Sequence, residues 1–305
     1  MVSRPLGVAA GVIADRVLGE PPVPAHPVAG FGAVMRNVET RLYRDARPAG
    51  AAHAAVGVGI AAAAGAALHS PAAAAYVAVA GRSLAQTALG IEATLERHDL
   101  DAARALLPAL VGREPSQLDE PEIARAVVES VAENTVDAVV APALWAAAAG
   151  APGVFAYRAV NTLDAMVGHR SPRYEQFGWA SARLDDLAGL IPARVTAGLV
   201  AAVRPRSAAR VARAVREDAP AHPSPNAGIA EAAFGAALGL RLGGVNRYGD
   251  RVEHRPALGD GRTAAPGDIR AAVRLSRDVT GALVALLAVP SVLRWMWRRR
   301  DRRHR

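Results

Sequence analysis

Two long runs of small apolar residues constrain the fold of this chain more than any other feature. Residues 49–68 and 71–91 consist almost entirely of Ala, Gly and Val, and only His69, Ser70 and Pro71 separate them. Each run is about long enough to cross a bilayer core of roughly 30 Å as a helix. Because Ala is only weakly hydrophobic, two buried helices of a soluble protein are the alternative. We interpret the pair as a helical membrane hairpin.

Three further apolar segments extend this pattern. Residues 279–297 end in two Trp residues, as in an interfacial aromatic belt, and are predicted to form the strongest span. Residues 136–157 are interrupted by GAPG at 150–153. A single crossing there would put the polar motifs before 136 and after 161 on opposite membrane faces, so we favour a broken or re-entrant helix pair.

The segment 187–203 has a charge near its middle. A central arginine such as Arg194 costs about 2.5–3.5 kcal/mol on insertion scales, so this segment either crosses the membrane or lies along its interface. No segment shows sustained alternation of polar and apolar residues, and Pro, Gly and Asp cluster at 217–226 and 243–268, which we interpret as loops. We therefore predict an all-α, polytopic integral membrane bundle, one membrane-embedded domain over 1–305, whose polar inserts carry the site.

The composition excludes several kinds of chemistry. The chain has no Cys, which excludes disulfides, thiolate metal sites and thiol nucleophiles. It also has no Lys, which excludes the lysine of a P-loop and any lysine Schiff base. Its net charge of +8 comes from arginines that flank apolar runs, such as those in the tail 298–305. This distribution is typical of the positive-inside rule and argues against nucleic acid as a partner.

An acidic stripe stands out in residues 126–137, AVVESVAENTVD. On a helix, Glu129, Glu133 and Asp137 are spaced at i, i+4 and i+8, with Asn134 beside them. Like charges at this spacing destabilise a helix, and we identify no Arg on the same stripe that relieves the repulsion. The stripe therefore predicts a cation nearby, which is a metal ion, a substrate amine or an arginine from elsewhere.

Several unusual polar strings follow one another along the chain: DRVLGEP (15–21) with AHPV (25–28), VGREPSQLDE (111–120), VESVAENTVD (128–137), YRAVNTLD to LIPAR (157–194), HPSPNAG (222–228) and LRLGGVNRYG (240–249). Read in order, these strings resemble the adenosylcobinamide-phosphate synthase family of cobalamin biosynthesis (CobD/CbiB). The resemblance covers residues from about 7 to about 250. Two strings depart from the family pattern, which has GDP at 19–21 and RDT-x-x-LD in place of REPSQLD.

The resemblance implies a membrane carbon–nitrogen ligase. Members of this family are similar in joining adenosylcobyric acid to (R)-1-amino-2-propanol phosphate, or to aminopropanol, with ATP and Mg²⁺. Amide formation in water requires an activated carboxylate, a divalent metal that neutralises phosphate charge and cationic groups that hold the phosphate. The chain has no Walker A string, so ATP must be held in another way.

The residues can be matched to these roles. Asp, Glu and Asn oxygens suit Mg²⁺, and we assign the metal–phosphate role to Glu133, Asp137 and Asp164. Structural ion pairs with Arg158 or Arg183 are the alternative for these carboxylates. The predicted catalytic residues are Glu129, Glu133, Asn134, Asp137, Asn161, Asp164 and His26; the predicted substrate-binding residues are Arg113, Arg183, Asp185, Asp186, His222, Ser224, Asn226 and Asn246.

Some of these assignments have competing interpretations. His26 and His222 each precede a proline, which fixes the loop, so either is a candidate base for the attacking amine or a loop residue that forms hydrogen bonds. Arg170 and Arg173 are weaker phosphate candidates.

Two other functions compete with the ligase. Carboxylates within a helical bundle also mark the ion paths of a membrane transporter, and a non-catalytic membrane relative would share the scaffold. We expect a multi-pass protein of the bacterial plasma membrane with its site on the cytoplasmic face. It would form a homo-oligomer or associate with other late corrinoid-pathway enzymes.

Overall fold

The computed structural model describes residues 3–20, 27–112, 114–169, 171–248 and 251–301, and side chains up to residue 289 apart from 247–252. The chain forms two compact units. Unit 1 comprises residues 1–80, 141–189 and 283–305, and unit 2 comprises 81–140 and 190–282. The expectation of one membrane-embedded domain over 1–305 stays a prediction.

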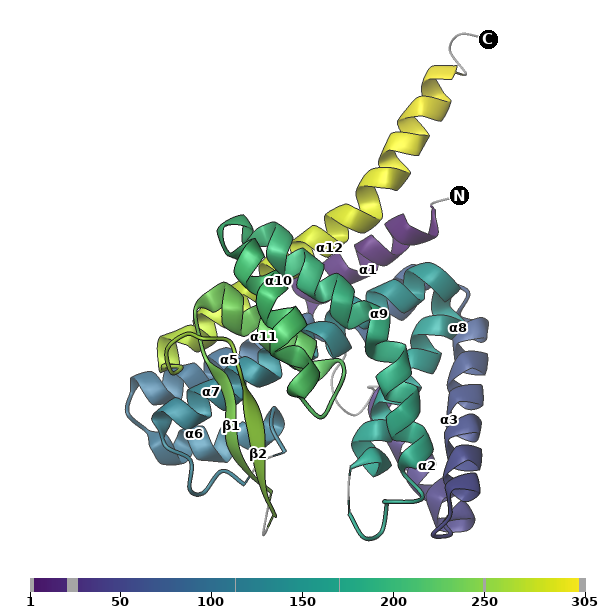
Figure 1. Ribbon diagram of the computed structural model, residues 1–305. Coiled ribbons are helices and arrows are strands. Elements are labelled where there is room, and N and C mark those ends of the chain that lie inside the picture. The colour runs from purple at the N-terminus through teal and green to yellow at the C-terminus, as the bar shows by residue number, and fades with distance from the viewer. Residues whose placement is uncertain (1–2, 21–26, 113, 170, 249–250, 302–305) are drawn as a thin grey trace. The chain divides into compact units, whose positions relative to one another are not determined.

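Helices α3 and α8 pack against each other in unit 1 (Figure 1). Small residues let them approach: a Cβ on Gly65 of α3 would lie 2.5 Å from the carbonyl oxygen of Ala151, and one on Gly57 would lie 2.8 Å from Leu163. The helices of this unit are α1 (Arg4–Leu18), α2 (Pro27–Leu42), α3 (Arg47–Leu68), α4 (Pro71–Ala78), α8 (Ala141–Leu163), the π-helical turn η4 (Asp164–Gly168), the start of α9 (Trp179–Val203) and the end of α12 (Pro266–Asp301).

The predicted membrane hairpin is half right. The first run forms α3, a continuous helix of 22 residues. The second run is not a span, because α4 ends at Ala78, Val79 is extended, and α5 (Gly81–Glu96) begins afresh. An eight-residue helix rises only about 12 Å, well short of the bilayer core.

The predicted break at GAPG is confirmed. Gly150 has a φ of 71° inside α8, which interrupts the helical backbone, and Pro152 follows two residues later. Glycine reaches this left-handed region without the steric penalty that other residues incur. The polar residues after 157 therefore follow a kink rather than a straight helix.

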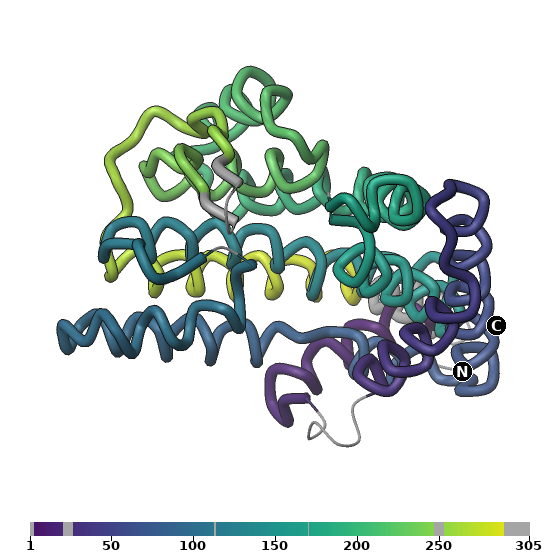
Figure 2. The backbone as a smooth tube through the Cα atoms, turned by 90° about the horizontal axis from the view of Figure 1, so that it is seen from below, coloured from purple at the N-terminus to yellow at the C-terminus, as the bar shows by residue number. Residues whose placement is uncertain are grey.

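Unit 2 is built around three helices that lie side by side: α5, α7 (Glu120–Thr135) and the first part of α12 (Pro266–Asp301), as Figure 2 shows. Arg270 of α12 forms ion pairs with Glu92 and Glu96 of α5, and Thr135 of α7 donates a hydrogen bond to Ser276 of α12. The unit also contains α6 (Leu100–Leu106), η2 (Leu107–Ala109), η3 (Val136–Val140), η5 (Pro205–Ser207), α10 (Ala208–Glu217), η6 (Ala219–Ala221), α11 (Ala227–Leu238) and a hairpin of β1 (Leu242–Tyr248) and β2 (Arg251–Leu258).

The hairpin corrects the loop predicted over 243–268. Strands β1 and β2 are antiparallel, with Asn246 opposite Glu253 and a register irregularity between Leu242 and Gly244. Gly243 and Gly244 both have positive φ. Because neither has a side chain, the sequence of β1 lacks the alternation of polar and apolar residues that indicates a strand. The described residues are otherwise overwhelmingly helical, as predicted.

In the part of the chain that the structure describes, three helical stretches are long and apolar enough to cross a membrane. They are Arg47–Leu68, Glu120–Gly168 and Trp179–Val203, and the last two contain the predicted segments 136–157 and 187–203. The predicted span 279–297 lies within α12, but its side chains from 290 onward lie outside the described residues. The fold is therefore a helical membrane bundle.

Candidate functional site

The acidic stripe of α7 does form on a helix, as the spacing predicts. The helix begins with a capping box in which Asp119 accepts from the Glu122 N–H at 2.9 Å and Glu122 accepts from the Asp119 N–H at 3.0 Å. Asp137 follows in the π-helical turn η3, a distortion that often marks functional sites. Glu129 is buried, whereas Glu133, Asn134 and Asp137 are half-buried, so one end of the stripe is accessible.

The stripe is not without an arginine, and that inference from the sequence was wrong. Arg125 precedes Glu129 by four residues, and its Nη1 lies 3.9 Å from Glu129 Oε1. The same guanidinium donates to the carbonyl oxygens of Gly243 and Val245, while Glu129 accepts from the Gly243 N–H at 2.7 Å. Arg125 and Glu129 thereby fasten strand β1 to α7.

Gly244 makes this contact possible. A Cβ at Gly244 would lie 3.0 Å from Nη1 of Arg125, and its φ of 102° is one that other residues rarely adopt. The pair of glycines at 243 and 244 therefore belongs to the site, because it brings the strand backbone against the arginine.

The predicted loop residue His222 lies in unit 2, and the structure fixes its hydrogen bonding. Arg255 of β2 donates from Nη1 to His222 Nε2 at 2.7 Å. Because arginine is always a donor, Nε2 must be the unprotonated nitrogen, and Nδ1–H then donates to the Ser224 carbonyl oxygen at 3.1 Å. Burial is the main reason why the pKa of His222 is lowered, which favours this neutral form.

Glu231 on α11 lies beside this pair. Its Oε1 is 3.5 Å from His222 Nε2 and 4.0 Å from Arg255 Nη1, and its side chain is 1% exposed. Burial raises the pKa of Glu231 well above its usual value, and the charges of Glu133 and Glu129 raise it further. A hydrogen bond with Glu133 connects Glu231 to the accessible end of the α7 stripe.

The hairpin of β1 and β2 carries further polar residues around Arg255. Asn246 and Glu253 are opposite each other in the register, and Glu253 Oε2 lies 3.6 Å from Arg255 Nε. Asn246 is 1% exposed, and neither polar atom of its amide has a hydrogen-bond partner among the described residues. We call Glu129, Glu133, His222, Glu231, Asn246 and Arg255 the glutamate cluster.

Loop 222–226 is held by its own polar groups. Ser224 Oγ accepts hydrogen bonds from the Asn226 N–H at 3.3 Å and the Ala227 N–H at 3.2 Å, just before α11 begins. A Cβ at Gly228 would overlap His222, so the small residue allows α11 to pack against the histidine. The structure thus places Ser224 and Asn226 as loop-forming residues beside the cluster.

A second polar group lies in unit 1. Asn161 Nδ2 donates to Asp185 Oδ1 at 3.3 Å, Arg158 Nη1 donates to Asn161 Oδ1 at 3.3 Å, and Asp164 lies near enough to Asp185 and Asp186 for their charges to interact. Asp164 begins the π-helical turn η4. We call Asn161, Asp164, Asp185 and Asp186 the aspartate cluster.

The predicted arginine pairings have mixed outcomes. Arg183 forms a half-exposed pair with Asp186 at 3.5 Å. Arg173, a weaker phosphate candidate, instead lies over the Tyr43 ring at 4.1 Å and pairs with Glu39 at 3.1 Å, which is a structural role. His26, Arg113 and Arg170 lie outside the described residues.

The predicted residues therefore form two groups, one in each unit. The assignment of Glu133, Asp137 and Asp164 to one metal stays a prediction, because these residues belong to different units. Among the residues that the structure describes, no three His, Asp or Glu side chains form a cluster suited to a metal ion. Mg²⁺ is usually bound by one or two carboxylates with phosphates and waters, so the half-buried oxygen donors still fit this ion.

Sequence reasoning missed Arg125, Glu231 and Arg255. Arg125 was detectable, because it continues the i, i+4 spacing of the stripe backwards. Glu231 was also detectable, as the single charged residue of the otherwise apolar helix α11. Arg255 had no such signal, because the strand that positions it was not predicted.

The fold and the two clusters define a helical membrane protein with buried ionisable groups. The sequence profile of the CobD/Cbib protein family matches residues 8–276. A cobalamin biosynthesis protein CobD from Mycobacterium tuberculosis H37Rv is 50% identical over 305 residues, which covers 96% of this chain and 97% of the relative. Its counterpart in Geobacter metallireducens is 41% identical, with 94% and 96% covered. The counterpart in Rhodobacter capsulatus is 45% identical, with 70% and 68% covered.

No solved structure matches this chain. The family match and the relatives together show that the chain belongs to the CobD/CbiB family, as the polar strings predicted.

Proposed function

We propose that this protein is the adenosylcobinamide-phosphate synthase of cobalamin biosynthesis. It would form an amide between adenosylcobyric acid and (R)-1-amino-2-propanol phosphate, or free aminopropanol, at the expense of ATP. The family relationship supports a role in cobalamin biosynthesis, and the observation that carries the enzymatic assignment is the glutamate cluster. Two buried glutamates and a buried histidine, together with the half-buried Glu133 and Arg255, are costly to fold, and such arrays are concentrated at functional sites.

The accessible part of the α7 stripe supports substrate and metal binding. Glu133 and Asp137 offer half-buried carboxylate oxygens, and Asn134 Nδ2 donates to the Ser130 carbonyl oxygen at 2.9 Å, which leaves its own oxygen for other contacts. We propose that Glu133, Asp137 and Asp164 hold Mg²⁺ and the phosphates of ATP. When bound, the metal would neutralise phosphate charge during carboxylate activation.

His222 is better suited to positioning than to proton transfer. Its Nε2 lone pair accepts from Arg255 and its Nδ1–H faces Ser224, so neither nitrogen is left for the attacking amine. We therefore assign His222, Ser224 and Asn226 to the shape of the loop, and Glu129 to the anchoring of β1. Asn246, whose amide lacks partners in the described residues, is the candidate for recognising an amide of the corrinoid.

The proposed location rests on the apolar helices and on the use of ATP. Three helical stretches with the length and composition of spans support a multi-pass plasma-membrane protein. Because ATP is cytoplasmic, we propose that the catalytic site lies on the cytoplasmic face.

Complementation tests the assigned step. A deletion strain blocked at this step should grow on cobinamide but not on cobyric acid, and this chain should restore growth on cobyric acid. The purified chain should also convert adenosylcobyric acid, aminopropanol phosphate, ATP and Mg²⁺ into adenosylcobinamide phosphate. A folded preparation that never forms this product would refute the proposal.

A further inference from the structure

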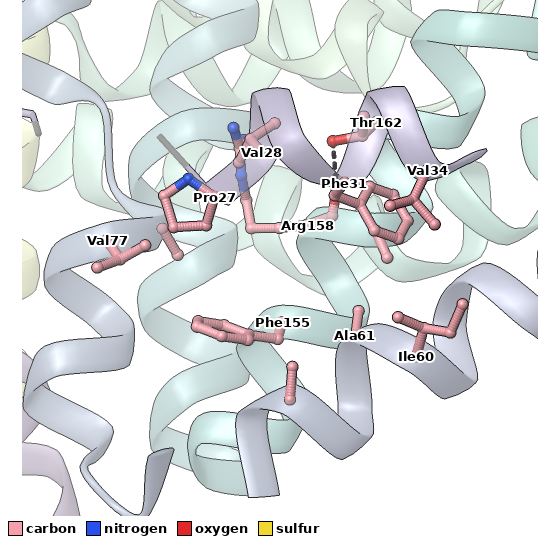
Figure 3. Close-up of a pocket in the computed structure, with 13 residues that line it drawn as sticks. Pro27, Val28, Phe31, Val34, Ile60, Ala61, Val77, Phe155, Arg158 and Thr162 are labelled. Carbon is pink, nitrogen blue, oxygen red and sulfur yellow. Dashed lines mark hydrogen bonds between the residues drawn. The ribbon is translucent and has the colours of Figure 1, made fainter. Parts of the chain in front are cut away.

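Unit 1 contains a cavity whose lining residues belong to neither cluster, although one of them, Arg158, donates a hydrogen bond to Asn161 of the aspartate cluster. Its volume is about 190 Å³, and its walls come from α2, α3, α4 and α8. Figure 3 shows Phe31, Ile60, Val77 and Phe155 around it, with Arg158 and Thr162 at one side. The lining is apolar except for Arg158 and Thr162, and Thr162 Oγ1 already donates to the Arg158 carbonyl oxygen. The cavity thus combines an apolar interior with one guanidinium.

The guanidinium has unused donors. Arg158 donates from Nη1 to Asn161 at 3.3 Å, and its Nε is buried without a hydrogen-bond partner among the described residues. A buried N–H without an acceptor is unfavourable, and charge makes it more so. An oxyanion in the cavity would supply the missing acceptor.

The start of α2 adds a second favourable field. Pro27 and Val28 line the cavity and form the first residues of this 16-residue helix. The N-terminal end of a helix carries a partial positive charge, so it favours an anion at the same place as Arg158.

The level of Arg158 along α3 argues against a lipid headgroup as the anion. Gly65 of α3 lies against Ala151, and Gly57 lies against Leu163 at the end of α8. Arg158 therefore lies level with the middle of α3, beside Ile60 and Ala61. If α3 crosses the membrane, this level is roughly 15 Å from either end of the hydrocarbon core.

We propose that this cavity binds a small amphipathic anion, whose phosphate or carboxylate contacts Arg158 and whose short apolar body fills the space beside Phe155 and Ile60. A volume of about 190 Å³ equals about six water-sized volumes of roughly 30 Å³. About six carbon-sized groups therefore fit inside, and a longer chain leaves the cavity beside Val34 and Ile60, whose side chains are 47% and 43% exposed. The site does not depend on the proposed synthase reaction.

A chain-length series tests the cavity directly. The purified full chain in detergent is titrated by calorimetry with alkyl phosphates from methyl to octyl, without corrinoid or ATP. Affinity should rise about fourfold for each added methylene, up to about six carbons, and then level off. On the unmodified protein, hexyl phosphate should bind at least about tenfold more tightly than hexan-1-ol, because only the phosphate engages Arg158.

Two variants separate the halves of the site, each with a matched control. Ala64→Leu fills the cavity and should remove the gain from chain length, whereas Ala63→Leu, at a neighbouring position that does not line it, should keep the gain. Arg158→Gln should make hexyl phosphate and hexan-1-ol bind alike, whereas Arg41→Gln on the exposed surface of α2 should change nothing.

Each contrary result is decisive. Equal binding of the phosphate and the alcohol to the unmodified protein would overturn the proposal even if Arg158→Gln fails to fold. So would an affinity that is independent of chain length, or a gain that survives Ala64→Leu. Displacement of hexyl phosphate by phosphatidic acid in mixed micelles would assign the cavity to a lipid and overturn the small-anion ligand.

Discussion

Arg255 Nη1 donates a hydrogen bond to His222 Nε2 at 2.7 Å, and this contact determines the chemistry of the glutamate cluster. It keeps the imidazole neutral, fixes its tautomer and places a positive charge 4.0 Å from the buried carboxyl group of Glu231. The histidine that the sequence offers as a possible base is therefore an acceptor for an arginine from a strand more than 30 residues later.

Replacement of Arg255 should lower the stability of the protein. Arg255→Gln leaves His222 Nε2 and Glu231 without their cationic partner, which should lower the free energy of unfolding by about 1–3 kcal/mol. Thermal unfolding in detergent measures this change. Arg213→Gln is the matched control, because Arg213 forms an exposed pair with Asp260 and its loss should cost at most about 1 kcal/mol. Equal effects of the two substitutions would contradict the role given to Arg255.

Glu231 should make the protein less stable as pH rises. Its pKa is raised in the folded state, so above the ordinary value of about 4.5 the folded protein holds a proton that the unfolded chain has released. Stability from this group is complete below pH 4.5 and declines as pH approaches the folded pKa. Glu231→Gln keeps the shape without the ionisation and should flatten this part of the pH profile.

Unfolding midpoints between pH 5 and 8, measured with a chelator to remove divalent cations, test the Glu231 effect. Glu231→Ala should lower the midpoint at every pH, because it leaves a cavity and removes the hydrogen bond to Glu133. An unchanged pH profile in Glu231→Gln would show that Glu231 does not titrate as its burial implies.

The fold was predictable where one local pattern decides it. The length and apolar composition of 49–68 predicted the helix α3, and the string GAPG predicted the break at Gly150. The second apolar run was misread because Ala-rich composition does not reveal a short extended step such as that at Val79. The β-hairpin was missed because two adjacent glycines remove the alternation that identifies a strand. Gly244 leaves room for Arg125, whereas a Cβ on Gly243 would overlap the backbone of Pro256.

The site was predictable residue by residue but not as an arrangement. The stripe Glu129, Glu133 and Asp137 follows from helical spacing alone. The contacts of His222 with Arg255 and Glu231 depend on tertiary packing between α11 and β2, which no local pattern encodes. Polar strings identify the participants, whereas the partners that determine charge and tautomer come from distant segments.

The accessible carboxylates should be required for turnover but not for insertion. Glu133→Gln and Asp137→Asn keep volume and hydrogen bonding while removing negative charge, so they should reduce amide formation at least about 100-fold. Membrane fractionation should show normal insertion of both variants. Glu217→Gln is the control, because Glu217 forms an exposed pair with Arg216. Wild-type turnover in both variants would remove them from the site.

A side chain at position 168 should change the orientation of the Asp164 carboxylate by steric overlap. A Cβ at Gly168 would overlap the Asp164 carboxylate, which lies over it within the π-helical turn η4. Gly168→Ala must therefore rotate the carboxylate, at a small cost in stability because a side-chain tip can move. If Asp164 acts in the reaction, turnover should fall about 10- to 100-fold, since a displacement of about 1 Å is enough for such a loss. Gly59→Ala is the matched control, because a Cβ at Gly59 meets nothing within 4 Å. Equal turnover of Gly168→Ala and Gly59→Ala, with both proteins folded, would show that the orientation of Asp164 is irrelevant to the reaction.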